Sequence, residues 1–402
     1  MDLSSFYRLF FYLPQRLFSP LKVREIPEDR VDIWVHCSSL GEVMAAKPLV
    51  DCFLSKKLRI LMTVFTPAGF NKASELWKEK VKVLRFPLDS YFHLRKIIEK
   101  TKPKIFVNLE TELWPNLLTL IGKNKITAFL VNGRLSERNF KRSRLIRGTF
   151  KRLLEPFEKI YAQSEEDKER FIKLGARKEQ VVVTGNIKID SIDADLKGFN
   201  REELGIRSED FVILFASLRE KEERQILPII KELLSRFKNL KIFVAPRHLN
   251  RVEPIASELT RMRVGFVRWS EGRLGGEGVL IIDVLGKLRN FYYVTELVVM
   301  GGTFAPYGGH NILEPVSASR VVVVGPFYSN IKNEVKELRE QGAIFVVNNN
   351  DELVKKIDEL VGKRDSLKQL GEKAREWLLS KQGISKQICE EILLHLEEGS
   401  GF

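Results

Sequence analysis

Acidic side chains that could perform proton chemistry occur in two short polar segments of the amino-terminal half. Glu42 comes directly after Gly41, and Glu110 and Glu112 stand two residues apart beside Trp114. A carboxylate in the first turn of a helix is a candidate general base, able to take a proton from a hydroxyl nucleophile. The same place also suits a glutamate that only complements the helix dipole, so Glu42 by itself leaves both interpretations open.

The glycine-rich segment 301–315 indicates a second kind of chemistry, the binding of a nucleotide. Its four glycines let the backbone approach a ligand closely and leave N–H groups bare. Asn311 and Glu314 fall one turn apart at the expected start of a helix, where a carboxylate can accept hydrogen bonds from a ribose diol. A plain strand-to-helix turn is the alternative. The density of glycine and polar groups favours a nucleotide site.

Three further segments supply cations or a turn. Arg247, after Pro246, can grip a phosphate or carboxylate with two parallel hydrogen bonds. The turn 285–288 suits contact with a base or ribose, and equally a plain strand-to-helix connection. Lys188 follows the last expected strand of the first half, but a lone lysine is usually solvated and is weak evidence by itself.

These segments all follow apolar runs that predict β-strands. From Val31 onward such runs alternate with helical stretches, the pattern of βαβ units. The pattern lapses after Gly185 and resumes near Phe211. We therefore predict two doubly wound Rossmann-like α/β domains facing a cleft, with ligands at the carboxyl ends of the strands. The expected strands are 32–36, 59–64, 81–86, 104–109, 126–131, 159–162, 181–184, 211–216, 241–245, 264–267, 279–282, 297–300, 321–324 and 344–347.

The charge balance indicates an anionic partner. The 402 residues include 67 Lys and Arg against 53 Asp and Glu, a formal net charge of +14. Nucleic acid, acidic lipid and a phosphorylated substrate would each suit such a chain. Nucleic acid ranks last, because we find no arginine–glycine tract, zinc-finger spacing or aromatic RNA-binding signature.

Neither histidine nor cysteine spacing predicts a metal or redox site. The five histidines form no His-Glu-x-x-His or comparable cluster, so we expect no metal. Cys37, Cys52 and Cys389 are odd in number and widely scattered. We expect reduced thiols, as in a cytosolic compartment.

Two cationic segments are suited to a membrane surface. The aromatic run 6–13 is flanked by cations and is too short and interrupted to span a bilayer. It fits a segment lying on an anionic membrane or, alternatively, a helix packed against the first domain. Residues 138–152 carry seven cations among apolar residues. We expect one amphipathic basic helix there, suited to anionic lipid or a phosphorylated acceptor, or else a merely solvated helix face.

Taken together, the polar segments resemble those of the 3-deoxy-D-manno-octulosonate (Kdo) transferases of lipopolysaccharide synthesis. Six segments occur in the family's order and cover roughly residues 31 to 330, which makes the resemblance specific. The glycine-rich segment alone would indicate only a nucleotide-sugar glycosyltransferase of the two-Rossmann type. The matching segments are 36–42, 110–116, 132–136, 185–188, 245–248 and 308–315.

The resemblance implies transfer of Kdo from CMP-Kdo to a sugar hydroxyl of a tetraacylated lipid A precursor, with inversion at the anomeric carbon. Glu42 then corresponds to the base that deprotonates the acceptor hydroxyl, and Glu112 and Lys188 to positions of transition-state stabilisation. No metal or other cofactor is implied, because fixed N–H dipoles and cations can stabilise a departing CMP. The CMP-binding positions fall on Pro246, Arg247, Leu285, Gly286, Lys287, Leu288, Asn311, Ile312, Leu313 and Glu314.

A domain plan and a location follow from the resemblance. We expect a membrane-associating segment (1–30), an acceptor-binding domain (31–190), a linker (191–208), a CMP-sugar-binding domain (209–380) and a carboxy-terminal helix packing back toward the first domain (381–402). The expected partners are CMP-Kdo, the lipid A precursor and the anionic inner-membrane surface, with no nucleic acid. The expected place is the cytoplasmic face of the bacterial inner membrane, peripheral or anchored through the amino terminus.

The chain departs from the family pattern in three places. The usual Ser-Thr-His-x-Gly-Glu is replaced by residues 216–222, Ala-Ser-Leu-Arg-Glu-Lys-Glu, which lack the histidine and the glycine. The usual Gly-Glu-Leu reads Gly286-Lys287-Leu288, and the amino-terminal anchor is shorter and more interrupted. Two other functions stay open: a sugar-nucleotide epimerase of the same architecture, and a membrane-associated nucleotide-sugar binding protein without catalysis.

Overall fold

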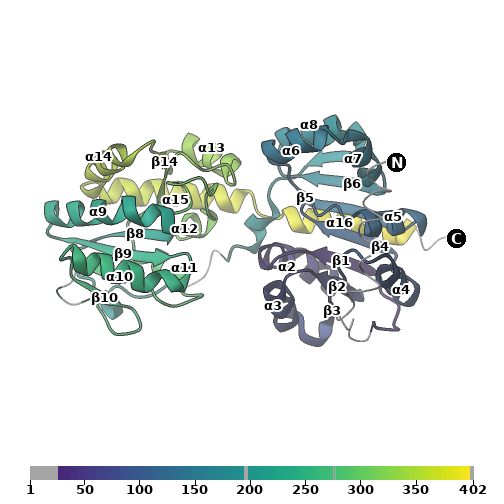
Figure 1. The fold of residues 1–402 in the computed structure, drawn as a ribbon, viewed down its shortest axis with the longest axis horizontal. Coiled ribbons are helices and arrows are strands. Elements are labelled where there is room, and N and C mark those ends of the chain that lie inside the picture. The colour runs from purple at the N-terminus through teal and green to yellow at the C-terminus, as the bar shows by residue number, and fades with distance from the viewer. Residues whose placement is uncertain (1–25, 194–197, 275, 277, 399–402) are drawn as a thin grey trace. The chain divides into compact units, whose positions relative to one another are not determined.

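The chain folds into two compact α/β units. The computed structural model describes residues 26–193, 198–274, 276 and 278–398. Unit 1 comprises residues 1–191 and 381–402, and unit 2 comprises residues 192–380. Most of the segment 1–30, which we expected to associate with a membrane, lies outside the described residues. In each unit, helices cover both faces of a central sheet (Figure 1).

Both sheets are parallel and seven-stranded, which confirms the predicted fold class. The sheet of unit 1 has the order β3-β2-β1-β4-β5-β6-β7, and that of unit 2 the order β10-β11-β9-β8-β12-β13-β14. Every expected strand is present among the described residues. The strands are β1 Ile33–Cys37, β2 Ile60–Val64, β3 Val81–Arg85, β4 Ile105–Leu109, β5 Thr127–Gly133, β6 Phe157–Ala162, β7 Val181–Val183, β8 Phe211–Leu218, β9 Leu240–Pro246, β10 Phe266–Arg268, β11 Val279–Ile281, β12 Leu297–Met300, β13 Val321–Val324 and β14 Ile344–Val346.

Helices connect successive strands in both units. Several begin at a residue whose side chain accepts a backbone N–H, such as Ser39, Thr66 and Ser164. The helices are α2 Leu40–Ser55, α3 Pro67–Trp77, α4 Tyr91–Thr101, α5 Pro115–Lys123, α6 Glu137–Arg144, α7 Arg147–Leu154, α8 Glu165–Leu174, α9 Glu220–Arg236, α10 Val252–Arg261, α11 Leu288–Tyr292, α12 Leu313–Ser317, α13 Lys332–Glu340, α14 Asn350–Val361, α15 Arg364–Ser380 and α16 Ile384–Glu398. No helix within the described ranges is long and apolar enough to cross a bilayer.

The strand order creates one switch point in each sheet. In unit 1 the connections run outward from β1 on one side and β4 on the other, and in unit 2 from β8 and β12. Loops that leave neighbouring strands in opposite directions open a crevice at the carboxyl edge, where doubly wound folds bind ligands. The segments that begin at Ser38, Glu110, Arg219 and Gly301 lie at these two places.

A buried carboxylate fixes the loop at the unit 2 switch point. Glu222, in the first turn of α9, is fully buried. Its carboxylate accepts the backbone N–H groups of Arg219 (2.9 Å), Gly302 (2.8 Å) and Phe304 (2.8 Å). One side chain therefore ties the end of β8 to the glycine-rich loop after β12.

Part of the expected linker 191–208 is packed on unit 2. The Phe199 ring contacts Trp269 and Phe291, with centroids 5.0 and 4.9 Å apart. Leu204 is buried as well. The low apolar content of this segment concealed the contacts, because a few apolar side chains suffice to dock it.

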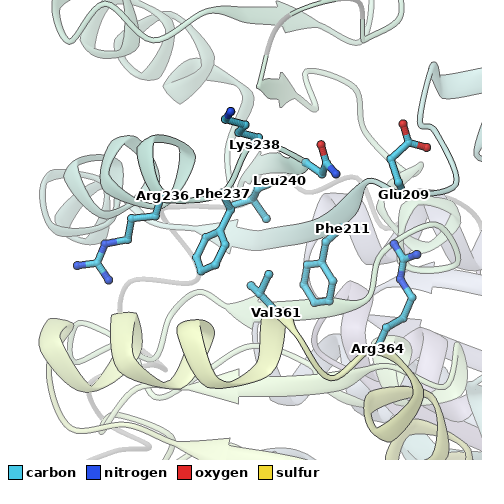
Figure 2. A pocket seen from close by; sticks show the side chains of 9 residues that line it. Glu209, Phe211, Arg236, Phe237, Lys238, Leu240, Val361 and Arg364 are labelled. Atoms are coloured by element: carbon cyan, nitrogen blue, oxygen red, sulfur yellow. The ribbon is translucent and has the colours of Figure 1, made fainter.

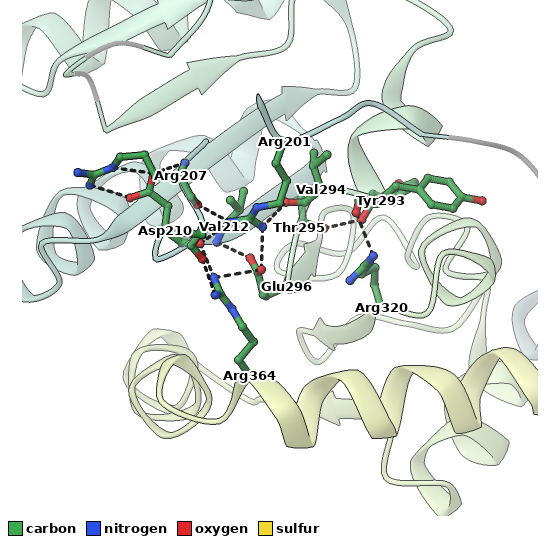
Figure 3. A network of polar contacts seen from close by, with 12 residues as sticks. Arg201, Arg207, Asp210, Val212, Tyr293, Val294, Thr295, Glu296, Arg320 and Arg364 are labelled. Atoms are coloured by element: carbon green, nitrogen blue, oxygen red, sulfur yellow. Dashed lines mark hydrogen bonds and ion pairs between the residues drawn. The ribbon is translucent and has the colours of Figure 1, made fainter. Parts of the chain in front are cut away.

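A polar network holds the same segment to the sheet (Figure 3). Glu296 accepts Arg201 Nη1 at 2.8 Å and the backbone N–H of Val212 at 2.7 Å. Arg201 and Arg364 also donate to the Asp210 carbonyl. The network joins the start of β8, the start of β12 and the start of α15.

The basic stretch 138–152 forms two helices and not the single helix we expected. α6 ends at Arg144 and α7 begins at Arg147. Ile146 leaves the helical region with φ −123° and ψ 35°, and Gly148 follows in the first turn of α7, where glycine weakens a helix. The prediction was wrong because charge and apolar spacing continue across this break.

The carboxy-terminal helix α16 belongs to unit 1. Ile388, Cys389 and Ile392 join the core on the sheet face that α2 covers. Tyr161 donates to Glu391 at 2.9 Å. A disulfide joins Cys52 of α2 to Cys389 of α16, with Cα atoms 6.5 Å apart.

The expectation of three reduced thiols is therefore wrong for Cys52 and Cys389, while Cys37 is free and buried. Spacing rules could not detect this pair, because 337 residues separate the two cysteines. Their proximity arises only when the end of the chain returns to unit 1.

We expect the Cys52–Cys389 disulfide to stabilise unit 1. The double variant Cys52→Ser/Cys389→Ser should lower the free energy of unfolding by about 2–4 kcal/mol, because the cross-link restricts the unfolded chain. Calorimetry with and without reductant measures this, and reduction should leave the double variant unchanged. Titration of the denatured, unreduced chain should find one thiol; three thiols would contradict the pairing.

We also expect Glu222 to stabilise unit 2. Glu222→Gln keeps the size but replaces an acceptor oxygen by a donor, and should lower the free energy of unfolding by about 1–3 kcal/mol. Chemical denaturation measures the loss. Glu220→Gln, at an exposed position of the same helix, is the matched control and should change stability by under about 0.5 kcal/mol. Equal losses of stability in the two variants would show that the three N–H contacts of Glu222 do not stabilise unit 2.

Candidate active site

Glu42 lies at the switch point of unit 1, in the first turn of α2. Its side chain is 5% exposed. One carboxylate oxygen accepts the backbone N–H of Ser38 at 2.6 Å, and the other accepts the Ser39 hydroxyl at 2.9 Å. Ser39 Oγ in turn accepts the N–H of Glu42 at 3.3 Å. The carboxylate is thus held in place at the carboxyl end of β1.

The surroundings of Glu42 favour its neutral form. The pKa of Glu42 is raised to about 7, chiefly by burial and also by the charges of Glu110 and Glu112, and the hydrogen bonds from Ser38 and Ser39 offset part of this rise. A carboxyl group with a pKa near neutrality is well matched to general base catalysis at that pH. Helix capping alone does not need a buried carboxylate, since an exposed one would complement the helix dipole equally well.

Glu110 and Glu112, which follow β4, both lie close to Glu42, but only Glu110 has a cationic partner in the described part of unit 1. Lys188, in the 3₁₀ turn Ile187–Ser191, forms an ion pair with Glu110, with Nζ 2.7 Å from Oε1. Glu112 and Lys188, the two positions expected to stabilise the transition state, form no ion pair with each other among the residues that the structure describes. No carboxylate contact of Glu112 occurs within the described part of unit 1. Its unneutralised charge is one reason why the pKa of Glu42 is raised.

Buried polar side chains fix the loop that carries these acids. Asn108, on β4, donates from Nδ2 to the carbonyl of Glu112 at 3.1 Å. Asp89 accepts the N–H groups of Asn116 (3.0 Å) and Leu117 (2.9 Å) at the start of α5. The loop is therefore held at both ends.

The expected nucleotide-binding residues of unit 2 gather around Glu314. Asn311 donates from Nδ2 to Glu314 Oε1 at 3.4 Å. Burial raises the pKa of Glu314, whereas the charges of Arg289 and Arg247 and the hydrogen bond from Asn311 lower it. Arg247 follows Pro246 at the end of β9, and Arg289 lies on α11. Two guanidinium groups therefore lie near a carboxylate at the same edge of the sheet.

The other expected binding positions differ in exposure. Ile312 and Leu313 are buried, so that their side chains serve the core and only their backbone is available. The turn that contains Leu285, Gly286 and Lys287 is exposed and leads into α11 at Leu288. Gly286 has φ +76°, a conformation that favours glycine.

In the glycine-rich loop, three of the four glycine N–H groups are bonded within the fold and are not bare as we expected. The N–H of Gly301 donates to the Ala216 carbonyl, that of Gly302 to Glu222 and that of Gly309 to the Gly302 carbonyl. The loop instead brings side chains together. A Cβ at Gly302 would lie 2.8 Å from the His310 ring, so glycine there makes room for His310.

Three features of the unit 2 site escaped the sequence analysis. Glu222 appeared only as part of a departure from the family pattern, although an acid in the first turn of a helix after a strand could have signalled its role. Arg289 follows the predicted turn by one residue and carried no signal of its own. The stacking of Arg219 on Tyr307 joins residues from two loops, which local spacing cannot reveal.

A cavity of about 430 Å³ lies at the opposite edge of the unit 2 sheet (Figure 2). Phe211 and Leu240, at the starts of β8 and β9, line it together with Arg236 and Arg364. Both cations are already occupied, Arg236 by Glu232 and Asp358 and Arg364 by the Asp210 carbonyl. This cavity is therefore separate from the candidate site.

The two units offer complementary chemistry. Unit 1 holds a buried carboxylate able to accept a proton, and unit 2 holds cations and hydrogen-bonding groups able to bind a phosphorylated nucleotide. Within the described residues, no three His, Cys, Asp or Glu side chains gather to hold a metal ion.

Solved structures with a similar fold are nucleotide-sugar enzymes. A UDP-N-acetylglucosamine 2-epimerase is 16% identical, with a TM-score of 0.65 over 92% of this chain and 97% of that one. The UDP-GlcNAc 2-epimerase of Neisseria meningitidis, solved with UDP-GlcNAc, is 15% identical, with a TM-score of 0.62 over 90% of this chain and 99% of that one. At such low identity the likeness establishes the GT-B type of fold alone.

Sequence relatives identify the family. The family described as 3-Deoxy-D-manno-octulosonic-acid transferase (kdotransferase) matches residues 11–191. A bifunctional glycosyltransferase/methyltransferase of Fusobacterium nucleatum is 34% identical over 87% of this chain, which spans only 54% of that relative. The 3-deoxy-D-manno-octulosonic acid transferase of Haemophilus influenzae is 30% identical over 91% of this chain and 87% of its own length. That of Aquifex aeolicus is 32% identical, with coverage of 86% and 90%. The chain therefore belongs to the 3-deoxy-D-manno-octulosonic acid transferase family.

Proposed function

We propose that this chain transfers Kdo from CMP-Kdo to a sugar hydroxyl of a tetraacylated lipid A precursor, with inversion at the anomeric carbon. Family membership supports the transfer of Kdo. The observation that carries the mechanism is the buried Glu42 carboxylate, whose pKa is raised to about 7.

Glu42 acts as the base in this proposal. Its carboxylate takes the proton of the acceptor hydroxyl while that oxygen bonds to the anomeric carbon of Kdo. The bond from the anomeric carbon to the phosphate oxygen breaks, and CMP leaves with the electron pair. A single displacement of this kind inverts the anomeric centre. The Ser38 and Ser39 contacts keep the carboxylate in place before the proton moves.

In this proposal Glu112 and Lys188 act through their charges and do not take or give the proton. The charges of Glu110, which pairs with Lys188, and of Glu112 both raise the pKa of Glu42 and so keep it basic. Glu112 and Lys188 stabilise the transition state in this proposal, and Glu110 belongs to the same group of charged side chains. Substitution of Lys188 would leave two negative charges near Glu42 in place of one.

The departing CMP binds to unit 2 in this proposal. Asn311 and Glu314 offer an amide and a carboxylate for the ribose hydroxyls, and Arg247 offers two parallel donors for the phosphate. The negative charge that develops on the phosphate is stabilised by fixed cations, so the step needs no metal or other cofactor.

The tip between α6 and α7 fits the surface of an anionic membrane, and we propose that the chain works at the cytoplasmic face of the bacterial inner membrane. Leu145 is 86% exposed and lies between the exposed cations Arg142, Arg144 and Arg147. An apolar side chain surrounded by cations suits an interface of acyl chains and acidic headgroups. An acylated, phosphorylated acceptor would be met at the same surface.

Incubation of the purified chain with CMP-Kdo and the lipid A precursor tests the proposed function. CMP release should depend on the acceptor, and mass spectrometry of the lipid should find added Kdo. Absence of a Kdo-bearing lipid would end the proposal. A binding screen of CMP against UDP tests the epimerase alternative, which only the shared fold supports; preference for UDP would favour it.

We expect the rate to depend on the ionisation of Glu42. Because only the ionised carboxylate accepts a proton, kcat/KM should fall as the pH is lowered through about 7, the raised pKa of this group. Glu42→Gln should remove this dependence and lower kcat by about 10²–10⁴-fold. Glu75→Gln, at an exposed position of α3, should leave both unchanged. Near-normal turnover of Glu42→Gln would exclude this base.

We expect the Leu145 tip to bind anionic vesicles. Arg144→Gln should weaken binding to phosphatidylglycerol vesicles about fivefold, since each surface cation contributes about 1 kcal/mol. Leu145→Asp should weaken it at least as much, and salt should weaken the wild type. Sedimentation with vesicles measures both. Leu394→Asp, at a leucine of α16 that is 59% exposed, is the control; an equal effect there would refute a specific role of the tip.

A further inference from the structure

Arg219 stands where the chain departs from its family pattern, at the switch point of unit 2. It follows β8 directly and precedes α9, and its N–H is bound by Glu222. Its guanidinium lies over the Tyr307 ring, with Cζ 4.2 Å from the ring centroid. The backbone anchor and the ring platform together restrict where this long side chain can point.

The Arg219 guanidinium has no carboxylate partner in the described part of unit 2, whereas many other arginines of the chain form ion pairs with a carboxylate. Arg247 also forms no ion pair in these described residues, although its charge acts on Glu314. Both charges act on the same neighbour, because burial and then the charges of Arg247 and Arg219 lower the pKa of His310 to about 4. The His310 ring is therefore neutral at pH 7, and its Nε2 is buried without a hydrogen-bond partner in the structure.

Two unpaired guanidinium groups at one edge of a sheet call for a ligand with two anionic groups. Bringing two such cations together without anions is unfavourable, and a guanidinium binds a phosphate or a carboxylate with equal ease through two parallel hydrogen bonds. A nucleotide monophosphate supplies one anion. The sugar of the family's name is an acid and supplies the other.

The chemistry of the donor places these two anions next to each other. In the CMP ester of a 2-ulosonic acid, the anomeric carbon bears both the phosphate oxygen and the carboxylate. The anions are thus separated by a single carbon atom. Arg219 and Arg247 are neighbours too, because they follow the paired residues Leu218 of β8 and Pro246 of β9, and the N–H of Arg247 donates to the Leu218 carbonyl at 2.8 Å. A neutral sugar joined to CMP would leave one of the guanidinium groups unpaired.

We propose that Arg219, held over Tyr307, binds the carboxylate of the donor sugar, while Arg247 binds the phosphate. This assignment rests on the proposed function and deepens it, because it makes Arg219 the residue that selects an acidic sugar. Arg247 is given to the phosphate because it lies near Glu314 and Arg289, beside the expected nucleotide. Arg219 lies instead between β8 and α9, close to the glycine-rich loop, because Glu222 accepts the N–H groups of both Arg219 and Gly302.

Affinities for CMP and for CMP-Kdo test the assignment. Arg219→Ala should weaken the binding of CMP-Kdo about tenfold or more and change that of CMP by less than about twofold, because only the former carries the carboxylate. Arg247→Ala should weaken both ligands. Arg219→Lys keeps the charge but not the fork of donors and should fall in between. Tyr307→Leu, which removes the ring platform, should weaken CMP-Kdo alone.

The outcomes separate the assignment from the proposed function. Retained CMP binding shows that Arg219→Ala is folded, so a loss confined to CMP-Kdo supports the carboxylate contact. Equal weakening of CMP and CMP-Kdo would assign Arg219 to the phosphate, and no change in either would leave it as a packing partner of Tyr307. Either result overturns the assignment while wild-type transfer stands. A wild type that makes no Kdo-bearing lipid overturns the proposed function instead.

Discussion

The removal of the Glu42 carboxylate from water is the constraint on which the unit 1 site depends. Within the part of the chain that the structure describes, only the Ser38 N–H and the Ser39 hydroxyl replace the lost water, and the nearby charges of Glu110 and Glu112 oppose its ionisation. The strand order makes this arrangement possible, since β1 and β4 are neighbours whose loops leave in opposite directions. Lys188 limits the repulsion by pairing with Glu110. The result is a fixed carboxylate whose surroundings favour the protonated form.

The two units place a buried glutamate at the same point of the fold and use it differently. Glu42 and Glu222 are each the third residue of the helix that follows the first strand of a doubly wound sheet. Glu222 is fully buried and accepts three backbone N–H groups, so its hydrogen-bonding capacity holds the glycine-rich loop. Glu42 accepts two donors and keeps capacity for a substrate hydroxyl. We infer that hydrogen bonds from the backbone distinguish the structural acid Glu222 from Glu42, the proposed base.

The strands, and the edge of each sheet at which the candidate residues lie, could be predicted from the sequence because both depend on local order. Apolar runs located every strand. A parallel sheet places the residues that follow its strands at one edge, and Glu42 and Arg247 both lie at such an edge. Contacts between distant segments could not be predicted. The Cys52–Cys389 disulfide, the Lys188–Glu110 pair and the use of the glycine N–H groups by Glu222 all depend on the assembled fold. The break at Ile146 was missed because a single backbone angle interrupts a continuous pattern.

Direct titration of Glu42 tests the central claim, that its environment makes this carboxylate a base near neutral pH. Infrared difference spectra between the wild type and Glu42→Gln isolate the carbonyl stretch of this one protonated carboxyl group, which is then followed against pH. The account predicts that the band disappears with a midpoint near pH 7, the raised pKa of Glu42. A midpoint near 4.5, the ordinary pKa of a glutamate, would contradict the account, whatever the activity of the chain.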